Sequence, residues 1–332
     1  MRRLINCILF AAVVLLGAIQ ACRVFGASGQ VLMYYREEGP SRESIYNMEE
    51  QERSRGKSAP ADSAAWAFER DLEIENRALG KKVKSEGFFV YGSRELAVYC
   101  GLESGSYSGR WERGSCMISR GLAMELFGSV EVTGKTVWYG RQDYTVRGVT
   151  EETKKQIFLP AKQDQMFQYI LFDYRSVDPP GNVRGRTEAE QLLNQYGMGG
   201  ISCGADGTYF AAAAGLLSVL PVWLLMAKGL FLWTRREKRP LLQAAAVGLA
   251  AAVFCGSLYL LARLGAGYPR DLIPSRWSDF DFWVKAYEDI AGDVRNMREI
   301  TQAAWLTEIR QSLGLCALCS AGSGMWALFG VR

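Results

Sequence analysis

The sequence predicts an α-helical membrane protein with four transmembrane helices and a large extracytoplasmic α+β domain. Three observations support this fold class. Four long apolar runs interrupt a chain of 332 residues, of which 49% are hydrophobic. The charged residues lie almost entirely between these runs, and the longest intervening stretch mixes strand-like and helix-like patterns. A run of about 20 apolar residues is what a helix needs to cross the hydrocarbon core of a bilayer.

The first predicted transmembrane helix occupies residues 1–22, where an apolar run from Leu4 to Cys22 follows two arginines. A cleaved signal peptide is the alternative, because the end of this run, Ile19–Cys22, is similar to a lipoprotein cleavage box. Gln20 fits that box poorly, and a multi-pass protein needs this helix. We therefore expect a retained anchor.

Three more transmembrane helices are predicted in the last third of the chain. The second covers residues 209–233 and has an aromatic residue at each end, as interfacial belts prefer. Lys228 lies near the end of this helix, so its long side chain can reach the membrane surface. The third covers residues 241–263 and is rich in Ala and Gly, and the fourth, with the cytoplasmic end of the chain, covers residues 312–332.

The basic residues predict the orientation. Arg2 and Arg3 precede the first helix, and the turn at residues 234–240 carries four basic residues: Arg235, Arg236, Lys238 and Arg239. Both clusters belong on the cytoplasmic side by the positive-inside rule, and four alternating helices satisfy both at once. Residues 23–208 and 264–311 then lie outside, in a multi-pass protein of the plasma membrane.

Residues 23–208 are expected to form the outer α+β domain, and its centre has the clearest local pattern. Residues 116–119 form a short apolar strand, after which Ser119 can cap a helix that Gly128 ends. Residues 136–139 and 144–146 flank a turn and indicate a β-hairpin. A further capping box at 187–190 predicts a short helix that Gly197 terminates.

The order of these parts resembles that of MacB/FtsX-type ABC transporter permeases, which have one helix, a large outer domain and three more helices. Residues 116–128 resemble the strand–helix pair of that family's MacB-like periplasmic core domain, and residues 134–137 and 144–149 follow in the same order. The resemblance implies a separate ABC ATP-binding subunit and a homodimer or a heterodimer with a related permease. It also implies that the chain relays ATPase motion to its outer domain.

One departure from the family pattern keeps an alternative open. Such permeases usually carry a coupling helix between the second and third membrane segments, and here only residues 234–240 connect them. The basic residues of this turn, Arg235, Arg236, Lys238 and Arg239, are candidates to face the ATPase, or they serve only as a topology signal. The alternative function is a membrane-anchored binding or sensory protein that kept the permease scaffold without ATPase coupling.

Three cysteines of the outer domain, Cys100, Cys116 and Cys203, fall where oxidising conditions permit disulfides. We expect Cys100 to pair with Cys116, because a bridge closing a loop of about 15 residues adds roughly 3 kcal/mol of stability. Reduced buried cysteines and pairing with Cys203 are the alternatives. Cys316 and Cys319 lie in the fourth apolar run and are expected to be small packing residues.

Residues 264–311 contain an amphipathic helical pattern. Apolar residues recur every three or four positions on one face, beginning with Trp277, Phe280, Trp283, Tyr287 and Ile290. We expect a helix that rests on the outer domain or at the membrane interface. The alternative is a helix that binds a partner or gates a substrate.

The composition argues against an enzyme. The chain has no histidine, which excludes Ser-His-Asp and Cys-His pairs and histidine-ligated metals. The segment from Gly128 to Lys135 has one residue too many between its glycines for a phosphate-binding loop. The net charge of +4 is too balanced for a nucleic-acid binder. We expect no cofactor or metal in this chain.

Overall fold

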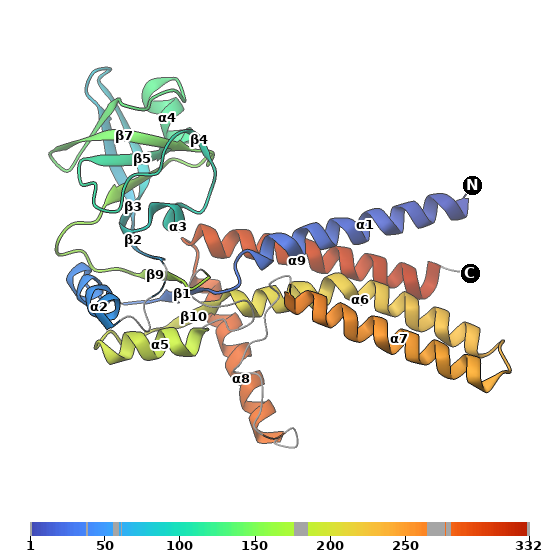
Figure 1. Cartoon of the computed structure of the whole chain (residues 1–332). Coiled ribbons are helices and arrows are strands. Elements are labelled where there is room, and N and C mark those ends of the chain that lie inside the picture. The colour runs from blue at the N-terminus through green and yellow to red at the C-terminus, as the bar shows by residue number, and fades with distance from the viewer. Residues whose placement is uncertain are drawn as a thin grey trace.

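The computed structural model describes residues 2–37, 39–55, 60, 62–175, 185–263, 276 and 280–330. Figure 1 shows a domain of strands and short helices at one end of the molecule and four long helices at the other. The expected combination of a mixed sheet-and-helix domain with four apolar helices is therefore present.

The long helices are α1 (Arg2–Phe25), α6 (Gly207–Thr234), α7 (Pro240–Leu261) and α9 (Ala304–Met325), which continues into a π-helical turn, η4 (Trp326–Gly330). Each is long and apolar enough to cross a membrane. The N-terminus, the C-terminus and the α6–α7 connection all lie at the end opposite the sheet (Figure 1). The described fold thus gathers both predicted cytoplasmic basic clusters at one end.

One ten-stranded sheet organises the domain, in the order β10-β1-β9-β2-β3-β8-β5-β7-β4, and β6 pairs with β2 and β7. Most pairs are antiparallel, whereas β3 with β8 and β5 with β7 are parallel. The strands are β1 (Gln30–Tyr34), β2 (Asp62–Asn76), β3 (Lys81–Gly92), β4 (Leu102–Gly105), β5 (Ser115–Ser119), β6 (Thr136–Tyr139), β7 (Gln142–Thr150), β8 (Gln156–Pro160), β9 (Tyr169–Asp173) and β10 (Cys203–Asp206).

The short helices confirm the strongest local signals of the sequence. Ser119 caps α4 (Arg120–Phe127) by accepting a hydrogen bond from the Leu122 amide, and Gly128 ends it with φ of 73°. Gly140 and Arg141 both have positive φ, which gives the β6–β7 turn the twist that a tight hairpin needs. The remaining short helices of the domain are α2 (Arg42–Arg55), α3 (Arg94–Val98) and α5 (Arg186–Gln195).

The sheet separates two apolar cores. One core packs α2, α4 and α5 against one face, with residues such as Met48, Leu122 and Leu193 fully or almost fully buried. The second core packs α3 and the sheet-proximal parts of α1, α6 and α9 against the opposite face, through residues such as Val24 and Trp305. Helices α1, α6 and α9 therefore pack directly against the sheet domain, whereas the described residues of α7 take no part in this core.

Two predicted boundaries need correction. The sequence predicts a capping box at 187–190, but α5 begins at Arg186, because the Gly185 amide donates to the Glu188 carboxylate. The last long helix begins at Ala304, not at 312, since Trp305 and Leu306 are buried against the sheet. The amphipathic pattern forms α8 (Phe280–Asn296), followed by a 3₁₀ turn, η3 (Met297–Glu299).

Candidate functional site

The site that the fold singles out is the junction where the long helices meet the sheet. Only residues 26–29 separate α1 from β1, and β10 ends at the residue before α6 begins. Strands β1 and β10 pair with each other in antiparallel register, from Val31 with Asp206 to Tyr34 with Cys203. The ends of two long helices are thus fixed to two neighbouring strands with almost no intervening chain.

Close backbone packing tightens this joint. A Cβ on Gly207 would lie 1.9 Å from the carbonyl oxygen of Ala27, so only glycine fits at the start of α6. Asp206 caps α6 by accepting a hydrogen bond of 2.7 Å from the Thr208 amide. Thr208 Oγ1 in turn accepts one of 3.4 Å from the Gly29 amide. The first turn of α6 therefore contacts the turn that follows α1.

A chain of hydrogen bonds, which we call the junction network, ties α9 to the same place; it is buried at Trp305, Gln30 and Asp173 and reaches the surface at Arg175. Trp305 Nε1 of α9 donates to Gln30 Oε1 on β1 at 2.6 Å. The Gln30 amide nitrogen donates to Asp173 Oδ2 on β9 at 3.1 Å. Arg175 pairs with Asp173 and also donates to the Gly26 carbonyl beyond the end of α1, at 2.8 Å. The network of Trp305, Gln30, Asp173, Arg175 and Gly26 connects two helices through the sheet.

Burial makes the junction network intolerant of missing partners. Gln30 has no exposed surface, and Trp305 is 1% exposed. Burial alone would raise the pKa of Asp173, but the hydrogen bonds from Arg175 outweigh it and lower the pKa. The Asp173 carboxylate therefore stays ionised, and removing one partner would leave a buried polar group that costs about 1–3 kcal/mol.

A second contact joins the segment before α9 to the middle of the sheet. Trp66 Nε1 on β2 donates to the Gln302 carbonyl at 3.2 Å, and the Trp66 ring stacks on Tyr169 of β9 with centroids 5.3 Å apart. Burial raises the pKa of Tyr169 to about 12, so its hydroxyl remains neutral at physiological pH. Helix α9 thus enters the bundle from a segment that two strands hold.

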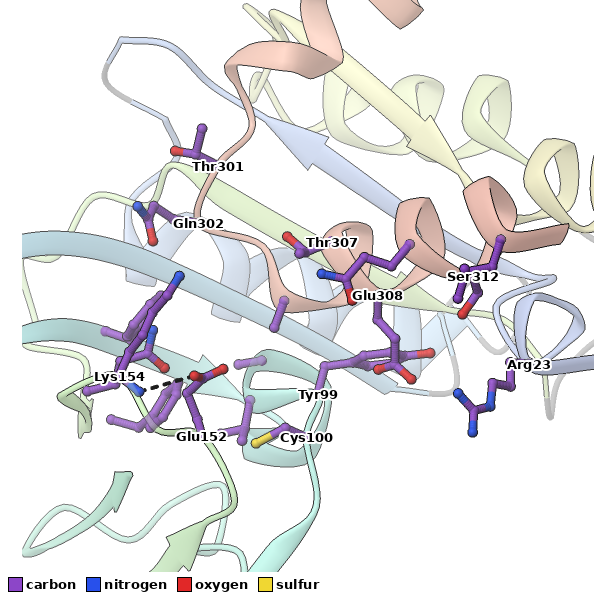
Figure 2. Close-up of a pocket in the computed structure, with 18 of the residues that line it drawn as sticks. Arg23, Tyr99, Cys100, Glu152, Lys154, Thr301, Gln302, Thr307, Glu308 and Ser312 are labelled. Atoms are coloured by element: carbon purple, nitrogen blue, oxygen red, sulfur yellow. Dashed lines mark hydrogen bonds between the residues drawn. The ribbon is translucent and has the colours of Figure 1, made fainter. Parts of the chain in front are cut away.

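A cleft of about 440 Å³ lies beside this contact, between α1 and α9 on one side and α3 and β8 of the sheet domain on the other. Figure 2 shows its wall of residues from α3 and the β7–β8 connection facing α9. Its lining combines apolar side chains such as Phe158 and Leu315 with charged ones: Arg23, Glu152, Lys154 and Glu308. The cleft leaves space between α9 and the sheet on the side away from the junction network.

Two polar groups in the cleft are held in unusual settings. Burial, followed by the nearby Glu308 carboxylate, raises the pKa of Tyr99, whose backbone adopts a left-handed conformation with φ of 46°. Gln20 of α1 is 7% exposed, and its Oε1 accepts no hydrogen bond from the described residues. The cleft therefore presents a neutral hydroxyl and a buried acceptor beside its charged rim.

The opposite end of the bundle carries the predicted basic turn. Arg235, Arg236, Lys238 and Arg239 are all exposed, and no helix lies between Thr234 and Pro240. Nearby, Lys228 donates to the carbonyls of Ala327 and Leu328 at 2.9 and 2.7 Å. Lys228 thus binds two carbonyls within η4, in addition to the interfacial role that the sequence predicts, and joins α6 to the end of α9.

The disulfide expected between Cys100 and Cys116 is not found, since both are free thiols and so is Cys203. Cys116 lies on β5 in one core, whereas Cys100 packs against the core on the opposite face of the sheet. Burial raises the pKa of the Cys100 thiol and raises that of Cys203 to about 11. The sheet itself keeps Cys100 and Cys116 apart, despite their short separation in sequence.

The predicted amphipathic stripe is present on α8 from Phe280 onward, and Trp277 lies outside the described residues. Phe280, Tyr287 and Ile290 are exposed, and Trp283 is 36% exposed.

Among the described residues, no group of three or more Cys, Asp or Glu side chains is placed to hold a metal ion.

The junction residues Gln30, Asp173 and Trp305 were not predicted from the sequence. They come from segments far apart in the chain, and no spacing rule connects them. The one local signal was Asp206-Gly207-Thr208, a capping residue followed by glycine at the start of an apolar run. That signal identifies the start of α6 but not what α6 contacts.

Comparison with known proteins gives structural neighbours only. No protein-family model matches the sequence, and no curated protein matches it. The extracellular domain of the noncanonic ABC-type transporter YknZ from Gram-positive bacteria is 17% identical and covers 52% of this chain and 97% of its own, with a TM-score of 0.39. The periplasmic region of MacB from Actinobacillus actinomycetemcomitans is 10% identical and covers 55% of this chain and 90% of its own, with a TM-score of 0.44. One neighbour is thus the extracellular domain of an ABC-type transporter, and the other is the periplasmic region of MacB, after which the core domain that the sequence motifs resemble is named.

Proposed function

We propose that this chain is a permease-like membrane subunit of an ABC-type export or cell-envelope-remodelling system. Its four long helices cross the plasma membrane, and the sheet domain lies outside the cytoplasm. A separate ATP-binding subunit moves the helices, and the junction transmits this motion to the sheet domain. The proposal assigns the chain no catalytic step and no cofactor.

The observation that carries this proposal is the direct attachment of α1 to β1 and of β10 to α6. Because β1 and β10 are hydrogen-bonded neighbours, a displacement of α1 against α6 must shear that pair or move the sheet as a whole. The junction network adds α9 to the same rigid joint. Packed elements of this kind transmit small displacements because their interfaces do not deform continuously.

The exposed turn at 235–239 is the surface that we propose for the ATP-binding subunit. Its arginines and lysine are all exposed, with Arg235 lying over the Phe231 ring, so they can face a partner with an acidic surface. A second permease copy or a related chain would complete the transporter. Helix α7 offers a surface for it, since only 6% of the most apolar part of α7 is buried.

A second candidate function rests on the same turn. With no helix between Thr234 and Pro240, the chain has only a small surface on which an ATPase could dock. A membrane-anchored binding or sensory protein would need no such surface, and its junction would carry signals inward from the outer domain instead.

Purification of the tagged chain from native membranes in mild detergent tests these alternatives. We expect an ATP-binding protein to co-purify, and Arg235→Glu with Arg236→Glu to reduce its yield by about tenfold, with a loss that high salt reproduces. Lys81→Glu with Lys84→Glu, two exposed changes in the sheet domain, serves as the matched control and should retain the partner. Absence of an ATP-binding protein from the wild-type preparation would favour the sensory function.

A further inference from the structure

Helix α8 uses one face for contacts with its own chain and leaves its apolar face uncovered. Phe282, Ala286 and Asp293, which share one side of the helix, are partly buried. Phe280 and Tyr287 on the other side are 78% and 73% exposed. The fold therefore does not account for the apolar stripe.

The uncovered stripe is continuous over the whole helix. Besides Phe280 and Tyr287 it includes Val284, Ile290 and Val294, and all five of these side chains are exposed. No residue of α8 is fully buried. An exposed apolar stripe of this length is typical of a surface that lipid or another protein covers.

The position of α8 indicates that lipid covers the stripe. Figure 1 shows α8 leaving the junction beside β10 and running across the direction of the four long helices. It lies at the level where α6 and α9 pass from the bundle into the sheet domain (Figure 1). If the long helices cross a bilayer, this level is the outer membrane–water interface, and a helix lying crosswise there is parallel to the membrane surface.

The charges of α8 narrow the choice of lipid. Its exposed polar residues are three acids, Asp281, Glu288 and Asp289, and two bases, Lys285 and Arg295, while Asp293 is already paired with Arg186. Helices that bind anionic lipids place lysines and arginines on their polar side instead. Contact between α8 and lipid must therefore come from burial of the apolar stripe and not from attraction to acidic headgroups.

We propose that α8 lies in the headgroup region of the outer leaflet, with its apolar stripe inserted among the lipid chains, and that it binds neutral lipid as readily as acidic lipid. This proposal rests on the membrane crossing in the proposed function but not on ATPase coupling. Asp293 forms an ion pair with Arg186 of α5, and the Cys203 thiol of β10 lies near the Asp293 carbonyl. The helix therefore connects the lipid surface to the strand that continues into α6.

Fluorescence quenching on the full-length protein in phosphatidylcholine vesicles tests this placement. Tyr287, Asp289 or Leu249 is replaced singly by an amino acid with a dansyl side chain. Position 287 lies on the stripe, 289 on the polar side of the same helix, and 249 on the exposed surface of α7. Each variant is titrated with iodide in the water and with nitroxide-labelled lipid in the bilayer.

We expect lipid-borne nitroxide to quench the probe at 287 at least about twofold more than the probe at 289, and iodide to show the reverse, as insertion of about 5–10 Å requires. The same ratios should hold when half of the lipid is phosphatidylglycerol. Strong iodide quenching at 287 would overturn the proposal, and so would protection from both quenchers, which would mean that protein covers the stripe. A probe at 249 that lipid does not quench would instead disprove the membrane crossing.

Discussion

Helices α6 and α7 are consecutive, similarly apolar and joined by a short turn, yet the structure uses them differently. Helix α6 continues from β10 and packs against α1 and α9, whereas the main neighbour of α7 is α6 alone. In its most apolar part α6 is 22% buried and α7 only 6%. Hydropathy assigns both to a membrane, but only α6 belongs to the body that holds the sheet domain.

The glycines show the same difference at the level of atoms. Gly207 at the start of α6 touches the Ala27 carbonyl so closely that no side chain fits. Gly248 and Gly256 of α7 have open space where a Cβ would be. Gly207 thus serves close packing at the junction, while Gly248 and Gly256 of α7, like Gly229 near the far end of α6, leave a smooth surface for lipid or for another chain. The comparison places α1, α6 and α9 in one packed body with α7 at its periphery, so under the proposed function these three helices carry the motion.

The largest expected effect comes from removing the residue that holds α9 in the junction. Trp305→Ala deletes a fully buried ring and the donor to Gln30, so the free energy of unfolding should fall by about 3–5 kcal/mol. Trp305→Phe keeps a smaller aromatic ring but removes the donor, with a loss of about 1–3 kcal/mol. Thermal unfolding of the purified protein in detergent measures both.

Trp233→Ala at the far end of α6 is the matched control for Trp305→Ala. This side chain is 39% exposed, so its loss should change the unfolding free energy by no more than about 0.5 kcal/mol. Equal losses for Trp305→Ala and Trp233→Ala would show that the junction is no more important to the fold than the end of the bundle near the turn.

The next effect compares the two helices directly. Gly207→Ala forces the α1–β1 turn away from α6 and should destabilise the protein by about 1–3 kcal/mol. Gly248→Ala in α7 meets no neighbouring atom, and the higher helix propensity of alanine should stabilise by up to about 1 kcal/mol. Opposite signs in the two unfolding midpoints would confirm the comparison, and a shared sign would refute it.

Local signals in the sequence predicted much of this fold. The cap at Ser119, the helix end at Gly128 and the turn at Gly140 each depend on residues a few positions apart, and each occurs where expected. The four apolar runs were found because hydropathy is a property of continuous sequence. Such features need no knowledge of tertiary contacts.

The junction could not be predicted in the same way. Gln30 and Trp305 lie 275 positions apart, and neither has a neighbour in sequence that reveals its partner. The early start of α9 was missed because Glu308 and Arg310 lower the hydropathy of its first turns, although Trp305 and Leu306 are buried there. The expected Cys100–Cys116 disulfide was wrong because separation in sequence does not show on which side of the sheet a residue lies. The sheet places these two thiols in separate cores.

A smaller effect at the junction follows from the pH dependence of Cys203. Burial raises the pKa of this thiol to about 11, above its ordinary value of 9.0. Below pH 9 the thiol is neutral in both the folded and the unfolded chain, so its full contribution to the free energy of unfolding is present. As pH rises from about 9 to 11 the unfolded chain ionises first, and the protein loses stability.

Cys203→Ala should therefore flatten the decline of the unfolding midpoint between pH 9 and pH 11 relative to the wild-type chain. Circular dichroism during heating at several pH values measures this slope. Identical slopes in the two proteins would mean that the Cys203 thiol ionises as easily in the folded chain as in the unfolded one.

The smallest effect changes no stability and reports only on exposure. Cys255 of α7 is exposed, whereas Cys316 of α9 is fully buried with its sulfur 3.6 Å from the Ala214 carbonyl of α6. In detergent, N-ethylmaleimide should modify Cys255 at least about tenfold faster than Cys316, because a buried thiol reacts only after local opening. Mass spectrometry of digested protein gives both rates, and prior reduction should leave the number of reactive thiols unchanged. Modification of Cys316 as fast as Cys255 would mean that α9 does not pack on α6, and the distinction between the junction-bound helices and the peripheral α7 would fail.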